Sequence, residues 1–204
     1  MIYMGWDNGS SGSIGIIGAT EKAIYFPTPT KEVPNYTKEG NIVSRINCGE
    51  IKRLLTSYGI TSENTRALIE RPFMAPVISI DCNTFVDFEE AKRQGLQGMF
   101  TYIDVKKKVP TVSMMFLKSS LNAHRSFEAT LITLESLRIG YEVVDSKAWQ
   151  HELLGLSVKG SAALKAASKA KGIQMFPYLE KEINKQKDAD GLLLAHYCQL
   201  YYNQ

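Results

Sequence analysis

Residues 5–17, GWDNGSSGSIGII, decide how the rest of this sequence is interpreted. An apolar run over residues 2–6 ends directly before Asp7, a turn rich in glycine and serine follows, and a second apolar run covers residues 14–17. This order predicts a strand, a tight turn and a second strand, because glycine allows the backbone angles that such a turn needs. Asp7 then lies at the rim of a sheet, beside serine hydroxyls that can contact a phosphate. Since an Asp before a glycine turn is also an ordinary hairpin residue, its role depends on the other carboxylates.

Further patterns extend this start into a mixed α/β sheet. Residues 23–26 predict the third strand of an antiparallel meander, residues 66–70 predict a buried strand that ends on Glu70, and residues 141–144 predict another strand. Prolines predict an irregular loop over residues 27–41. The spacing of apolar residues predicts helices over residues 42–58, 121–139 (stopped by Gly140), 149–154, 162–171 and 189–202.

Residues 76–118 do not fit this pattern, because proline, glycine and asparagine interrupt every long period. We therefore expect one domain over residues 1–204 with an insertion at about 76–118, which holds one short helix near residues 85–94. A chain of 204 residues is long enough to bury one large core.

The composition narrows the class of protein. Hydrophobic residues make up 44% and charged residues 22% of the chain, as in ordinary globular proteins. No apolar run reaches the roughly 18 residues of a membrane span, and the N-terminal residues lack a signal-peptide pattern. The three cysteines lie far apart without a C-x-x-C pair, which argues against a disulfide framework or a zinc site. We expect a cytoplasmic protein that acts away from membranes.

Lysine is concentrated in two parts of the chain. Residues 147–187 hold eight lysines against three acidic residues, and Lys106, Lys107 and Lys108 form a second cluster. A single cluster of this kind is often only a solvated helix face. Two clusters in a chain with well-placed carboxylates predict a polyanionic partner such as nucleic acid.

Two further carboxylates open the last predicted helix. Acidic residues are favoured in a first helical turn, but the small and apolar residues after Asp190 predict that this turn packs closely against the sheet. If Asp7 and Glu70 end neighbouring strands, the carboxylates share one rim. Charges about 4 Å apart repel by roughly 4 kcal/mol at an effective dielectric constant near 20, so such a cluster shifts its pKa values or binds cations. A ligand set of oxygen atoms alone favours Mg²⁺ or Mn²⁺.

Together these motifs resemble the RuvC-type Holliday-junction resolvases of the RNase H-like superfamily, including their phage-encoded branch. The resemblance is carried by G-x-D-x-G around Asp7, the strand that ends on Ile69 and Glu70, W-x-x-x-L-L-G over residues 149–155, and D-A-D-G-L-L-L-A over residues 188–195. It implies an RNase H-like mixed sheet, with three antiparallel strands followed by parallel strands and helices on both faces. It also implies a homodimeric, metal-dependent endonuclease that resolves four-way DNA junctions by paired symmetric phosphodiester hydrolysis.

The resemblance further implies roles for individual residues. Asp7 would ligate two Mg²⁺ ions, for which Mn²⁺ can substitute, and Glu70, Asp190 and, ranked below them, Asp188 would complete the site. Lys159 is the first candidate among the lysines that assist cleavage. The residues expected to bind branched DNA are Phe73, which would help to open base pairs, and Lys106, Lys107, Lys108, Lys147 and Lys165.

Two positions depart from the family pattern. Many relatives place the last two acids three residues apart, whereas Asp188 and Asp190 are two apart, or about 200° around a helix. Both can serve one site only if Asp188 lies before the first regular turn. Gln150 stands close to a position that is often basic in the family.

Three alternatives to a junction resolvase stay open. The first keeps the fold and changes the substrate to flaps, other branched DNA or RNA. The second is an actin-like or sugar-kinase phosphotransferase, although the chain is short for two such lobes and has no second glycine-rich phosphate loop. The third is a non-catalytic nucleic-acid-binding module, against which the carboxylates argue.

Overall fold

The computed structural model describes residues 1–34, 41–72, 78–82, 107–111, 114–155, 158 and 160–203. The chain divides into two compact units. The larger unit comprises Met1–Phe73 and Asn122–Gln204, and the smaller one comprises Met74–Leu121, whose bounds lie close to those of the predicted insertion. In the smaller unit β7 (Ile78–Cys82) pairs antiparallel with β8 (Lys107–Thr111). The short helix predicted near residues 85–94 lies outside the described residues.

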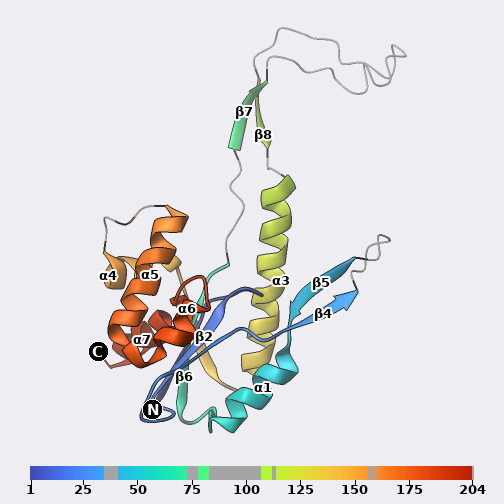
Figure 1. Ribbon diagram of the computed structural model, residues 1–204. Helices are drawn as coiled ribbons and strands as arrows, with labels where there is room; N and C mark the ends of the chain where they lie inside the picture. The colour runs from blue at the N-terminus through green and yellow to red at the C-terminus, as the bar shows by residue number, and fades with distance from the viewer. Residues whose placement is uncertain are drawn as a thin grey trace, which may run out of the picture. The chain divides into compact units, whose positions relative to one another are not determined.

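A five-stranded sheet in the order β3-β2-β1-β6-β9 forms the centre of the larger unit (Figure 1). The strands are β1 (Ile2–Trp6), β2 (Ser13–Ile17), β3 (Ile24–Pro27), β6 (Thr65–Glu70) and β9 (Gly140–Val144). The first three form an antiparallel meander, while β6 runs parallel to β1 and β9 runs parallel to β6. This confirms the predicted RNase H-like mixed sheet.

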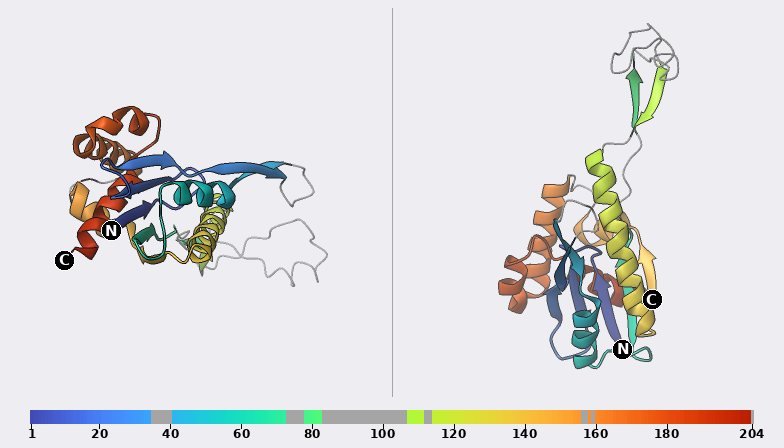
Figure 2. Two further views of the ribbon diagram at one scale, coloured as in Figure 1. Left: turned by 90° about the horizontal axis from the view of Figure 1, so that it is seen from below. Right: turned by 90° about the vertical axis from the view of Figure 1, so that its right-hand side faces the viewer.

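Helices cover both faces of this sheet, as predicted (Figure 2). Because side chains alternate along a strand, Met4 and Trp6 of β1 join the core that includes α1 (Cys48–Ser57) and α3 (Met114–Ser136), whereas Tyr3 joins the core on the opposite face. The elements packed on that opposite face are α4 (Ser146–Leu154), α5 (Ser161–Met175), η1 (Pro177–Leu179), α6 (Glu180–Asn184) and α7 (Asp190–Tyr202). Within the described residues, no helix combines the length and apolar character that crossing a bilayer requires.

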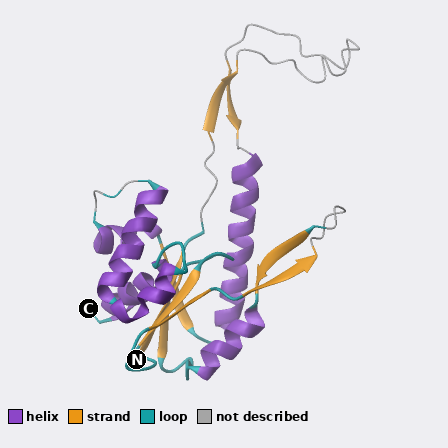
Figure 3. Ribbon diagram, in the orientation of Figure 1, coloured by secondary structure: helices purple, strands orange, loops and turns teal. Residues whose placement is uncertain are grey.

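The predicted loop over residues 27–41 was wrong for residues 27 and 30–34, which lie in strands, while residues 35–40 lie outside the described residues. The start of the predicted helix over residues 42–58 was wrong as well. Strands β4 (Thr30–Pro34) and β5 (Ile42–Ile46) form a separate antiparallel hairpin (Figure 3). Ile42 and Ile46 have helical spacing, but α1 begins only after Asn47, whose side chain accepts a hydrogen bond from the Glu50 amide at 3.3 Å. Pro34 is tolerated in β4 because both strands of the hairpin are edge strands, and Pro27 ends β3, an edge strand of the five-stranded sheet.

The helix predicted over residues 121–139 is longer at its start and ends without the predicted glycine. Helix α3 already begins at Met114 and ends at Ser136. Arg138 then adopts φ 54°, and the Ile139 amide donates to the Leu134 carbonyl at 3.0 Å, as in a Schellman C-cap. Gly140 therefore begins β9 and does not terminate the helix.

Glycines allow α7 to lie directly against the backbone of two strands. A Cβ atom at Gly5 of β1 would overlap the Ala195 backbone, and one at Gly15 of β2 would overlap the Leu192 backbone. A Cβ atom at Gly191 of α7 would in turn overlap Ser13. The first turn of α7 is therefore held against the end of β1 and the start of β2.

We expect Gly15→Ala to lower the free energy of unfolding by about 1–3 kcal/mol or more. The added methyl group would overlap the backbone of α7 at Gly191 and Leu192, so the whole helix would have to shift to make room. Gly49→Ala in α1 is the matched control, since its Cβ atom would lie 3.7 Å from the nearest atom, Asn47 Oδ1. Urea unfolding followed by circular dichroism measures both. Equal stability of the two variants would contradict the close helix–sheet contact.

Candidate metal centre

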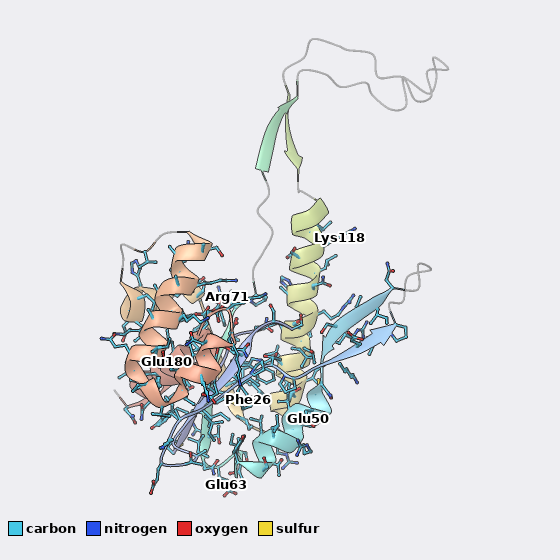
Figure 4. All side chains as sticks on the ribbon, viewed as in Figure 1. Phe26, Glu50, Glu63, Arg71, Lys118 and Glu180 are labelled. Carbon is cyan, nitrogen blue, oxygen red and sulfur yellow. The ribbon has the colours of Figure 1, made fainter. Side chains whose placement is uncertain are left out.

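The end of β1 and the end of β6 place two carboxylates side by side. Trp6 pairs with Ile69 in the parallel ladder, so the next residues, Asp7 and Glu70, lie at the same edge of the sheet, Asp7 just after β1 and Glu70 as the last residue of β6. Arg71, which is labelled in Figure 4, directly follows Glu70 at this edge. The sequence prediction that the two acids end neighbouring strands is confirmed.

Helix α7 brings the remaining carboxylates to this edge. Oxygen atoms of Asp7, Asp188 and Asp190 all lie within 4.8 Å of one another. Gly191 donates its amide hydrogen to Ser13 Oγ at 3.2 Å, and the Tyr25 hydroxyl donates to the Asp188 carbonyl at 2.7 Å. These bonds fix the start of α7 to β2 and β3.

The two-residue spacing of the last acids is compatible with one site. Asp190 is the first residue of α7, and Asp188 lies before it, outside the regular helix. The Asp188 carboxylate accepts a hydrogen bond from the Asp190 amide at 3.3 Å. Asp188 is only 8% exposed, so its side chain belongs to the cluster rather than to the solvated surface.

Two residues that the sequence prediction missed orient the carboxylates. Trp149 Nε1 donates a hydrogen bond to Glu70 Oε2 at 3.1 Å, and the Ser168 hydroxyl donates to Asp190 Oδ1. Ser168 Oγ also accepts the Ala189 amide hydrogen at 3.1 Å. Trp149 belongs to the W-x-x-x-L-L-G motif, so the sequence already marked its position. Ser168 is a buried serine within a helical pattern, and no sequence motif marks it as a site residue.

The carboxylates line a cleft of about 540 Å³ that also contains cationic side chains. Of the lysines predicted to bind DNA, Lys165 of α5 lines this cleft, whereas Lys147, exposed in the first turn of α4, is not among its lining residues. Lys187 and Gln150 line it as well. Lys107 and Lys108 belong to β8 of the smaller unit, and Phe73, Lys106 and Lys159 lie outside the described residues.

Burial and mutual repulsion weaken the acidity of the cluster. Burial, followed by the charges of Glu70 and Asp190, raises the pKa of Asp7 well above its ordinary value. Burial and the Asp190 charge raise the pKa of Glu70 to about 7, although the Trp149 hydrogen bond opposes this shift. Burial and the Asp188 charge raise the pKa of Asp190 to about 7, opposed by the Ser168 hydrogen bond.

These properties fit a hard divalent cation. A cation among the carboxylates would replace their repulsion with attraction, and the residues that line the described cleft offer oxygen ligands without histidine or cysteine. Asp7, Asp188 and Asp190 are close enough to share one ion. Glu70 lines the same cleft, outside this group of three.

No protein-family model and no curated protein sequence matches this chain. Among solved structures, RuvC of Thermus thermophilus matches with a TM-score of 0.45 and 10% identity over 98% of this chain and 97% of that one. T. thermophilus RuvC in complex with Holliday junction substrate matches with the same TM-score and identity, over 100% of this chain and 96% of that one. At this level of similarity, the assignment of a function rests on the chain's own residues.

We expect the metal-free protein to lose stability as pH rises from about 4.5 to above 7. Glu70 has an ordinary pKa of 4.5 and a folded-state pKa of about 7, so the folded state binds more protons than the unfolded state in this range. Asp190 acts in the same direction. The measurement is the Tm in a chelating buffer across this pH range.

Asp7→Asn should raise the Tm of the metal-free protein at pH 8 by several degrees, because it removes one buried charge from the cluster. Mg²⁺ should raise the Tm of the wild type but not of this variant. Glu63→Gln is the control, since Glu63 is exposed and precedes the other end of β6 (Figure 4). A wild-type Tm that does not respond to pH or to Mg²⁺ would argue against a metal centre.

Proposed function

We propose that this protein is a divalent-metal-dependent endonuclease that resolves four-way DNA junctions by paired phosphodiester hydrolysis. The observation that carries the proposal is the meeting of the Asp7, Asp188 and Asp190 carboxylates beside Glu70 at one sheet edge. The order of the motifs that surround these acids, and their resemblance to RuvC-type resolvases, supports a branched DNA substrate. Lys165 and Lys187 on the same cleft supply positive charge for a phosphate backbone.

The proposed cofactor is Mg²⁺, with Mn²⁺ able to substitute and two ions per site. Asp7, Glu70, Asp188 and Asp190 would hold these ions. Bound there, the ions would activate an attacking water and stabilise the leaving oxygen of a phosphodiester.

The protein's own residues prepare the site before any substrate binds. Trp149 holds the Glu70 carboxylate, and Ser168 holds that of Asp190, so neither has to find its orientation during the reaction. Lys165 lies close enough for its charge to lower the pKa of Asp7 and Asp190, against the larger effect of burial. In the proposed reaction it holds the phosphate oxygens that face the cleft.

We also propose that the active species is a homodimer. A four-way junction is nearly two-fold symmetric, and paired nicks need two active sites. Helix α3 supports an interface because it exposes large apolar side chains, with Leu121 59% and Ile132 58% exposed. Sedimentation of the protein with junction DNA tests this proposal, and a monomer bound to the junction at micromolar concentration would contradict it.

The direct test of the function is Mg²⁺-dependent cleavage of a labelled four-way junction. Wild type should introduce symmetric paired nicks, and Asp7→Asn should cleave at least about 1,000-fold more slowly while still binding the junction, because it removes a metal ligand. Glu63→Gln should cleave at the wild-type rate, since its side chain is exposed and distant along β6 from the cleft.

A flap, a linear duplex and an RNA–DNA duplex are assayed in parallel. Preferential cleavage of any of these by the wild type would contradict junction resolution and favour another substrate of the same site. Binding of the junction without cleavage in both Mg²⁺ and Mn²⁺ would contradict the nuclease itself.

A further inference from the structure

Three cavities of the larger unit adjoin one another along the turn between β1 and β2. The carboxylate cleft shares Ser11, Gly12 and Lys187 with a second cavity of about 430 Å³, here called the middle cavity. The middle cavity shares Ser10 with a third one of about 470 Å³, here called the hairpin cavity because β4 and β5 contribute to it. The three cavities therefore follow one another from the carboxylates to the β4–β5 hairpin.

The charge of the lining reverses along this path. The carboxylate cleft is acidic, whereas the middle cavity is lined by Lys185 and Lys187. The hairpin cavity is lined by Lys31, Arg45 and Arg125. Among the described residues, neither of these two cavities is lined by an aspartate or a glutamate. Such an order suits a polyanionic strand whose reacting phosphate lies among metal ions and whose neighbouring phosphates need cationic partners.

We propose that one strand of the nucleic acid runs from the carboxylate cleft through the middle cavity to the hairpin cavity. One phosphate faces Lys185 and Lys187 in the middle cavity. A later phosphate of the same strand binds between Lys31 and Arg125. The proposal rests on the proposed function for its class of ligand, and it gives the β4–β5 hairpin the role of a DNA-binding arm.

Binding of a labelled four-way junction in chelating buffer over a series of salt concentrations tests this strand path. Lys185→Ala should weaken binding about 3- to 10-fold and reduce the slope of log K against log salt by about 1, because it removes a cationic side chain from the middle cavity. The double variant Lys31→Ala/Arg125→Ala should weaken binding at least about 10-fold and reduce the slope of log K against log salt by about 1 or more.

The matched control is Lys52→Ala, which removes one positive charge from α1 at a residue that lines none of the three cavities. It should change binding less than about 2-fold. If Lys52→Ala lost as much affinity as the double variant, the strand path would be overturned. The DNA would then be attracted by the overall positive charge of the protein and not by these cavities. Wild-type affinity in Lys185→Ala or in the double variant would overturn the strand path as well.

The failure of this proposal can be told apart from failure of the proposed function. Binding is measured without Mg²⁺, so it does not depend on cleavage. A protein that binds DNA along this path but does not cut junctions would contradict the nuclease alone. A protein that cuts junctions while the path variants bind and cut like the wild type would contradict the path alone.

Discussion

The contact between the backbone of α7 and the backbones of β1 and β2 is the constraint on which the rest of this structure depends. With side chains at Gly5, Gly15 and Gly191, the helix would have to move away from the sheet. Without them, the first turn of α7 lies where β1 ends, and the Ser13 hydroxyl holds it there through the Gly191 amide. Asp188 and Asp190 therefore meet Asp7 because of packing, and not because the carboxylates attract one another.

The cluster that results is unfavourable by itself. Burial and like charges raise the pKa values of Asp7, Glu70 and Asp190, so part of the stability that the core supplies is lost at this edge. Functional sites commonly carry such a cost. The hydrogen bonds from Trp149 and Ser168 keep the carboxylates oriented in spite of it. A cation would remove the repulsion, which links metal binding to the stability of the fold.

The sequence was sufficient to predict those features that depend on short patterns. The apolar runs that end on Asp7 and Glu70 gave the strands and their common edge, and the small residues after Asp190 gave the close packing of α7. The β4–β5 hairpin was missed because Ile42 and Ile46 imitate helical spacing, and the end of α3 was missed because Arg138 takes a conformation usually left to glycine. The roles of Trp149 and Ser168 depend on contacts between distant parts of the chain, which no local pattern encodes.

The most direct test of the metal centre is anomalous scattering from crystals of the protein soaked in Mn²⁺. The account predicts at least one anomalous peak among the carboxylate oxygens of Asp7, Asp188 and Asp190, next to Glu70. Crystals of Asp7→Asn should show no peak at this position. Crystals in which saturating Mn²⁺ leaves this cluster without a peak would contradict the metal centre and the nuclease proposed from it.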